Sequence, residues 1–178
     1  MGSAHDSRSN AAAQPTSASQ SRDGSLELQL DAPTALAGER FTVHAHVKNV
    51  GLTPKRLYLI RSEPFRFNVR VYLRCADAPC GEPLPPARAH GYTVSEADSP
   101  ELRPGEELNF VVQAPRVPAD AAGPLTVYVS LSNDIKRWPG GVQTLDGATR
   151  PLFQTSGEIP NIWTGELVAH ATLAVSGR

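Results

Sequence analysis

The sequence lacks an excess of charge of either sign, and it lacks long apolar runs. Its 178 residues include 17 Lys and Arg against 18 Asp and Glu, which leaves a formal net charge of -1. Proteins that bind nucleic acid draw much of their affinity from excess positive charge, so nucleic acid is not an expected partner. No apolar run reaches the ~18 residues of a membrane-spanning helix, so we expect no transmembrane segment.

Windows long enough for a helix are also scarce, because 16 Pro and 14 Gly interrupt them. From residue 25 onward, apolar side chains instead alternate with polar ones, which is typical of strands with one buried face. The clearest case is the segment from Phe41 to Val47. We predict strands at residues 26–30, 41–47, 57–60, 65–74, 108–112, 125–131 and 167–175.

Short strands separated by turn residues, without helices between them, favour a sandwich or a barrel. We therefore predict an all-β fold: an immunoglobulin-like Greek-key β-sandwich of about seven strands, with a long elaborated loop before the last strand. This loop, residues 132–165, is longer than the ~12–15 residues usual for a connection without structure of its own. We expect a small ribbon within it, around the hairpin sequence Asp146-Gly147.

The first 24 residues contain hardly any apolar side chains. Such a segment cannot offset the entropy lost on ordering, so we predict a disordered tail over residues 1–24 and one domain over residues 25–178. Met1-Gly2-Ser3 is typical of an expression remnant. The polar residues behind it are typical of a tether after a removed signal peptide or a lipidated cysteine, so we expect an extracytoplasmic protein (periplasm, cell surface or secreted), with a lipid anchor as an open alternative.

The only two cysteines are Cys75 and Cys80. A turn between them can bring their Cα atoms within the ~4.4–6.8 Å that a disulfide requires, so we predict this bond. A disulfide would indicate an oxidising compartment. Two reduced thiols in a surface turn are the alternative, whereas zinc is not expected because no further Cys or nearby His completes four ligands.

Three segments resemble bacterial immunoglobulin-like modules: residues 39–51, which end in Asn49-Val50-Gly51, then Leu102-Arg103-Pro104-Gly105-Glu106, then residues 122–127. Their order is similar to the intracellular proteinase inhibitor family of the bacilli, with its Asn-x-Gly, Pro-Gly-Glu and Gly-x-Tyr-Thr-Val motifs. The resemblance covers about residues 25–131. Leu125 stands where that family has Tyr, and nothing after residue 132 resembles it. The resemblance implies a sandwich fold and a protease as the partner.

One strand carries a candidate binding stripe. Arg66, Arg70 and Arg74 recur every four residues on the outward side of the segment 65–74, and Tyr72 shares that side. Arg and Tyr are enriched at protein interfaces, so we predict a surface for an acidic partner or a glycan. The alternative is a solvated face balanced by acidic residues on neighbouring strands.

Both tryptophans lie in the long connection 132–165. Loops on a rigid sandwich commonly carry recognition, so Arg137, Trp138 and Trp163 are predicted to contact a protein partner. In the alternative, the aromatic side chains fold back and cover an open end of the sandwich.

His44 and His46 lie two residues apart on the outward side of a strand, where their rings could share a metal ion. Two exposed histidines without a ligand are the alternative. The sole methionine is Met1, which disfavours a thioether copper site.

The sequence contains no Gly-x-Ser-x-Gly elbow, no His-Glu-x-x-His and no phosphate-binding glycine loop. We therefore expect no enzyme and no cofactor. The expected function is a non-catalytic extracytoplasmic binding or accessory module that recognises a protein partner through loop 132–165. Proteinase inhibition, and metal binding by His44 and His46, are the alternatives.

Overall fold

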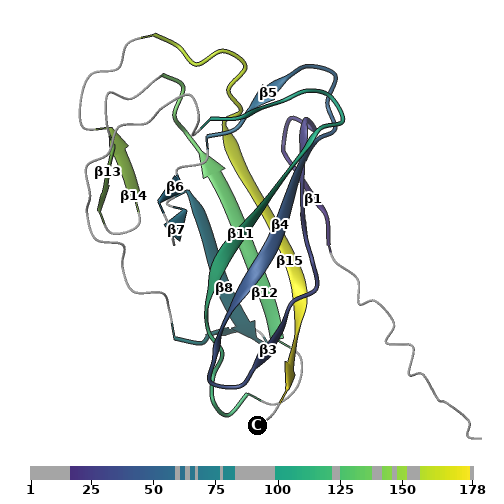
Figure 1. Ribbon diagram of the computed structural model, residues 1–178, viewed down its shortest axis with the longest axis vertical. Coiled ribbons are helices and arrows are strands. Elements are labelled where there is room, and N and C mark those ends of the chain that lie inside the picture. Colours follow the sequence, from purple (N-terminus) through teal and green to yellow (C-terminus); the bar gives the residue numbers. More distant parts are fainter. Residues whose placement is uncertain are drawn as a thin grey trace, which may run out of the picture.

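The computed structural model describes residues 17–58, 61–62, 65–66, 68–76, 78–82, 99–121, 125–137, 142–145, 148–151 and 157–176. Within these ranges the regular secondary structure consists of strands, with no helix. Two larger sheets lie face to face, as in a β-sandwich (Figure 1). The predicted all-β class is confirmed. In the same ranges no helix is long and apolar enough to cross a membrane.

The first sheet has the strand order β1-β2-β4-β11, and all its pairs are antiparallel. Its strands are β1 (Ser19–Gln20), β2 (Leu26–Leu30), β4 (Arg40–Asn49) and β11 (Glu107–Arg116).

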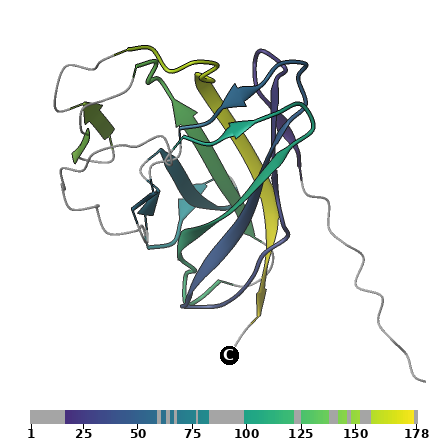
Figure 2. The same cartoon turned by 45° about the horizontal axis from the view of Figure 1, so that its top comes forward.

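The second sheet has the order β3-β15-β12-β8-β9. Its strands are β3 (Thr34–Leu36), β15 (Gly165–Ser176), β12 (Leu125–Asn133), β8 (Val69–Cys75) and β9 (Ala78–Cys80). Only the pair β3–β15 is parallel among these, since β15–β12, β12–β8 and β8–β9 are antiparallel. Consecutive strands β2 and β3 therefore belong to opposite sheets, and the chain crosses the edge of the sandwich between them (Figure 2).

Three short ribbons complete the described strands: β5 (Lys55–Arg56) with β10 (Glu101–Leu102), β6 (Arg61–Ser62) with β7 (Phe65–Arg66), and β13 (Val142–Leu145) with β14 (Ala148–Pro151). The last ribbon lies on either side of Asp146-Gly147, as the sequence predicted. It is drawn beside the sandwich in both views (Figures 1 and 2).

The core between the sheets consists of the apolar side chains that alternate along the strands. Each of these strands has one side that faces the core, so every second side chain along it is buried. A fully buried Leu or Val contributes about 1.5–3 kcal/mol relative to an exposed one. Nearly all residues predicted to face inward on four strands are buried: Leu26, Leu28 and Leu30; Phe41, Val43, Ala45 and Val47; Leu125, Val127, Val129 and Leu131; Leu167, Ala169, Ala171 and Leu173. Val175, predicted to face inward on the last strand, is only partly buried.

Two strand predictions differ from the structure. Of the predicted strand 57–60, residues 59–60 lie outside the described residues. Leu57 and Tyr58 are buried, but the pairing strand is Lys55–Arg56, and Leu57 is held by loop hydrogen bonds to Pro100 and Ser99 instead. The predicted strand 65–74 is interrupted, because the buried Asn68 donates a side-chain hydrogen bond to the Tyr58 carbonyl and β8 begins only at Val69. In both places the hydrogen-bond partner, and not the apolar pattern of the sequence, decides the secondary structure.

The end of the predicted tail is also part of the sandwich. Residues 1–16 lie outside the described residues, but Ser19 and Gln20 pair with β2, and Ser17 bridges His170 of β15. Hydrogen bonds rather than apolar burial hold this segment. Ser21 and Ser25 donate hydroxyl hydrogen bonds of 2.6 and 2.7 Å to the Asp23 carboxylate. A count of apolar residues therefore misplaces the start of the domain.

We expect Asp23→Asn to lower the free energy of unfolding by about 1–2 kcal/mol at pH 7. Partial burial opposes ionisation, but the bonds from Ser21 and Ser25 hold the pKa of Asp23 well below 3.8. A lowered folded-state pKa gives stability that is present above the unfolded value and lost as the pH falls below it. Urea unfolding at pH 7, 4 and 2.5 should show the gap between variant and wild type shrinking with acid.

The exposed Asp120 provides the control for this prediction. Asp120→Asn should change the free energy of unfolding by no more than about 0.5 kcal/mol at each pH. A wild-type advantage over Asp23→Asn that stays constant down to pH 2.5 would show that the carboxylate charge is not what stabilises the turn.

Candidate functional site

The outer face of the second sheet carries a row of aromatic side chains, which we call the tyrosine row: Tyr72 on β8, Tyr128 on β12 and His170 on β15. Tyr128 is the direct cross-strand partner of both others. The two tyrosine rings are parallel within 1° with centroids 4.9 Å apart, and the His170 ring lies 5.4 Å from Tyr128 at a tilt of 32°. Tyr72 is 41% exposed. The row thus places aromatic surface in solvent at the middle of a rigid sheet.

Arg70 and Arg74 lie on the same face as Tyr72, two residues before and after it on β8, opposite Ser130 and Thr126 of β12. The structure therefore brings together three of the four residues of the predicted stripe. Arg66 belongs to β7, and its side chain lies outside the described residues.

Tyr72 is a hydrogen-bond donor at neutral pH. Partial burial raises the pKa of its phenol, the neighbouring Tyr128 raises it further, and Arg74 opposes the change. The protonated hydroxyl can therefore donate a hydrogen bond to an acceptor on a ligand.

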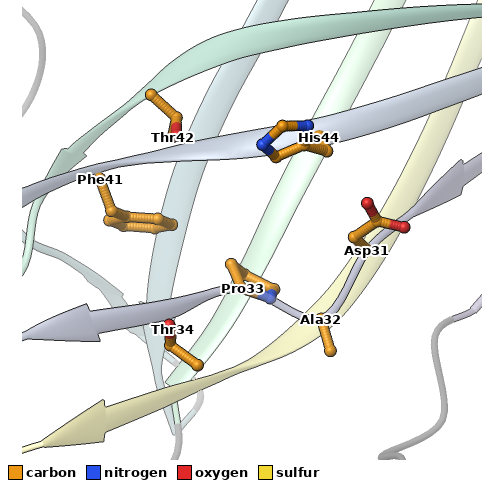
Figure 3. Close-up of a pocket in the computed structure, with 7 residues that line it drawn as sticks. All are labelled: Asp31, Ala32, Pro33, Thr34, Phe41, Thr42 and His44. Carbon is orange, nitrogen blue, oxygen red and sulfur yellow. The ribbon is translucent and has the colours of Figure 1, made fainter.

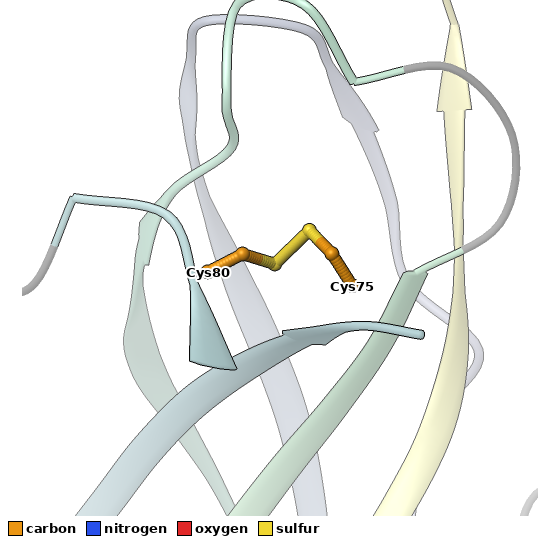
Figure 4. Close-up of a disulfide and its surroundings, with 2 residues drawn as sticks. All are labelled: Cys75 and Cys80. Atoms are coloured by element: carbon orange, nitrogen blue, oxygen red, sulfur yellow. A yellow bond between two sulfur atoms is a disulfide. The ribbon is translucent and has the colours of Figure 1, made fainter. Parts of the chain in front are cut away.

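The disulfide Cys75–Cys80 closes the end of β8 that carries this surface (Figure 4). The Cα atoms are 5.7 Å apart, as predicted from the turn, and both cysteines pack against the core. β9 pairs with the last three residues of β8 only, from Leu73 to Cys75. The bond thereby fixes the backbone at Arg74.

Among the binding residues predicted in the long connection, the two that the structure describes, Arg137 and Trp163, differ in exposure. Trp163 is 3% exposed and belongs to the core cluster, so it covers the interior instead of facing a partner. Asn133 anchors it by donating a 2.7 Å hydrogen bond to the Trp163 carbonyl. Arg137 is exposed and its backbone bridges Glu158, and Trp138 lies outside the described residues.

His44 and His46 both project from the outer face of the first sheet. His44 lines an open pocket of about 470 Å³ where the chain crosses from β2 to β3, together with Asp31, Thr42 and Phe41 (Figure 3). His46 donates from Nδ1 to Asn109 at 2.8 Å and from Nε2 to Asp31 at 2.9 Å. Both of its ring nitrogens therefore have hydrogen-bond partners.

No cluster of three or more His, Cys, Asp or Glu side chains suited to a metal ion occurs in the described part of the chain. The metal prediction for His44 and His46 has no third ligand among these residues. The arrangement of His46 fits a protonated imidazolium that donates two hydrogen bonds, so the contribution of His46 to stability should depend on pH.

We expect the His46 contacts to make stability depend on pH near neutrality. The hydrogen bond to Asn109, with that to Asp31, raises the pKa of His46 above 6.5 although burial opposes this. Its contribution is therefore complete below 6.5 and lost as the pH rises through the raised value. Relative to His46→Gln, the wild type should lose about 0.2–1 kcal/mol between pH 5.5 and 8.5 in urea unfolding.

Asn109→Ala gives an intermediate case, because it removes the largest cause of the shift and keeps the imidazole. Its pH dependence should fall between those of the wild type and His46→Gln. Parallel pH profiles for all three proteins would contradict the assignment.

Sequence reasoning found Tyr72 and the two arginines but missed Tyr128 and His170. Both occupy outward positions within strands whose inward residues were predicted, so the alternation alone marks them as exposed. What joins them to Tyr72 is the strand register.

No family model matches the sequence, and no curated protein matches it.

Proposed function

We propose that this chain is a non-catalytic, extracytoplasmic binding module, and that the tyrosine row with Arg70 and Arg74 recognises a protein partner. The observation that carries the proposal is the parallel pair formed by the exposed Tyr72 and the half-buried Tyr128, with Arg70 and Arg74 on the same face of the sheet. Tyr and Arg dominate the binding energy of many interfaces, because they combine large apolar area with directed hydrogen bonds. The disulfide supports an oxidising compartment.

We propose further that the sandwich is immunoglobulin-like with Greek-key connections. The strand order supports this assignment: β2-β4-β11 faces β3-β15-β12-β8-β9, and the N-terminal stretch is divided between the two sheets. The parallel pairing of β3 with β15 beside an otherwise antiparallel sheet fits the same topology. In this fold the row lies on the face formed by the three longest strands of the second sheet.

The proposal is tested by capture of partners from envelope and secreted fractions on three immobilised proteins. They are the wild type, the double variant Tyr72→Ser/Tyr128→Ser, and Val111→Ser, which removes an exposed apolar side chain from β11 in the first sheet. Quantitative mass spectrometry should find a protein whose recovery falls at least about tenfold with the double variant and is unchanged with Val111→Ser. Equal recovery on all three proteins, each shown to be folded by circular dichroism, would refute it.

Loop 132–165 is a second candidate for recognition, and this candidate includes inhibition of a protease. Its two ends are held together, because Ile159 donates a 2.9 Å backbone hydrogen bond to Lys136 and Arg137 bridges Glu158. Among the described strands, β13 and β14 pair only with each other. A projecting ribbon on a closed stem is suited to enter the cleft of a partner.

Replacement of residues 138–156 by a short Gly-Ser linker tests this candidate, because the stem bonds and the core stay in place. Loss of a captured partner, or loss of stoichiometric inhibition in a protease panel, would favour the loop. Cleavage of the intact protein as an ordinary substrate would reject the inhibitor.

A further inference from the structure

The first sheet has a gap at the place where β2 leaves it before β4 ends. β2 ends at Leu30, and Asp31 makes one more backbone hydrogen bond, of 3.1 Å, to the His44 carbonyl of β4. In this register the next hydrogen-bonded position, opposite Thr42, falls on Pro33. Proline has no N–H to donate to a neighbouring strand, so the pairing of β2 with β4 stops here.

The chain that leaves the sheet is held away from β4. The Pro33 carbonyl accepts a 3.2 Å hydrogen bond from Ala174 of β15, and Pro33 is buried. Thr42 is two residues from His44 on β4, so its backbone N–H and C=O point to the same side and face the gap. No residue in the described part of the chain pairs with them. Thr42 therefore offers one donor and one acceptor to an incoming strand.

The open pocket of about 470 Å³ lies at this gap, and Thr42, Phe41 and Pro33 line it (Figure 3). Among its described lining residues are one carboxylate, Asp31, and no Lys or Arg. Asp31 is exposed. Its Oδ1 accepts the hydrogen bond from His46, whereas its Oδ2 has no hydrogen-bond partner within the described ranges. The charge of the pocket therefore favours a cationic group on the ligand.

We propose that this pocket binds an extended segment of a partner protein that carries a Lys or Arg opposite Thr42. The backbone of that residue takes the ladder position that Pro33 does not fill, donating to the Thr42 carbonyl and accepting from the Thr42 N–H. Its side chain lies on the same face as Asp31, two strand positions away at about 6.6 Å, where it forms a charge-assisted hydrogen bond with the carboxylate. The pocket lies on the first sheet, so this inference goes beyond the proposed function and does not depend on the tyrosine row.

Three capped peptides test the two contacts separately, by amide chemical-shift changes of Thr42 and His44 in nuclear magnetic resonance titrations. They are acetyl-Thr-Lys-Val-Thr-amide, the same peptide with Gln in place of Lys, and the same peptide with a methyl group on the Lys backbone nitrogen. The first should bind about tenfold more tightly than either of the others. Glutamine removes the ion pair with Asp31, and N-methylation removes the donor to the Thr42 carbonyl.

Asp31→Asn should weaken binding of the Lys peptide about tenfold and leave binding of the Gln peptide unchanged. Asp120→Asn, which removes an exposed carboxylate elsewhere, should leave the affinity for both peptides unchanged. The variant Tyr72→Ser/Tyr128→Ser should also bind them as the wild type does. Equal affinity for the Lys and N-methyl peptides, or no shift changes at Thr42 up to millimolar peptide, would overturn the inference. Either result would leave the capture experiment on the tyrosine row unaffected, so the two proposals fail separately.

Discussion

Trp163→Ala should lower the free energy of unfolding by about 3–5 kcal/mol, because it opens a cavity in the core cluster that Trp163 fills. A domain of this size has roughly 5–15 kcal/mol in total, so this single change removes a large fraction. The indole also contacts the position of Gly165: a Cβ there would lie 3.3 Å from the Trp163 ring, at a φ of +141°. The start of β15 is therefore shaped around this side chain.

Urea unfolding followed by far-ultraviolet circular dichroism measures the effect. Trp163→Phe keeps most of the aromatic volume. Its loss in the free energy of unfolding should be less than half of the loss that Trp163→Ala causes. If Trp163 were instead a binding residue, Trp163→Ala would leave stability within about 1 kcal/mol of the wild type and abolish partner capture. That result would support the sequence-based prediction that Trp163 contacts a partner.

Burial could be predicted from the sequence for the strand residues but not for Trp163. Along 41–47 or 167–175 the alternation of side chains determines which residues are buried, because a strand has one inward side. Trp163 lies in a connection that has no regular alternation of apolar and polar side chains. Its burial depends on contacts with Asn133 and Arg56 from distant parts of the chain. No local pattern encodes such contacts.

The candidate surface shows the same division. Tyr72 was predicted because it stands between two arginines on one strand. Tyr128 and His170 join it only through the pairing of β8, β12 and β15, which sets Tyr128 opposite both. Arg66 was expected to extend the stripe, but the strand is interrupted at Asn68. Single-strand patterns therefore predicted individual residues, and the sheet register assembles the site.

Two of the sequence motifs lie together at one corner of the fold. The Asn-x-Gly and Pro-Gly-Glu motifs contact each other, because Gly105 donates a 2.8 Å backbone hydrogen bond to the Asn49 carbonyl. Glu106 accepts a 2.7 Å hydrogen bond from the Arg103 backbone and closes its own turn. Gly105 has a φ of +84°, which favours glycine there. Both motifs thus stabilise a corner of the sandwich, and inhibition stays a proposal that needs the protease assay.

Asn49 is the centre of that corner, and we expect Asn49→Leu to lower the free energy of unfolding by about 3–5 kcal/mol. The side chain is 0% exposed. Its Nδ2 donates to the carbonyls of Thr53 and Leu102 at 2.9 and 2.8 Å, and its Oδ1 accepts from Gly51 at 3.0 Å. Leucine has a similar size but leaves these backbone groups unpaired, at roughly 1–3 kcal/mol for each one that stays buried.

Asn49→Asp separates hydrogen bonding from packing, because it keeps the shape and exchanges the donor for an acceptor. At pH 8 the carboxylate should repel the two carbonyls that Asn49 pairs with, so this variant should also lose several kcal/mol. Near pH 4, protonation restores one O–H donor, and the deficit relative to wild type at the same pH should shrink. Guanidinium unfolding at both pH values measures it. An Asn49→Asp protein as stable as the wild type at pH 8 would mean that the paired carbonyls do not depend on the amide.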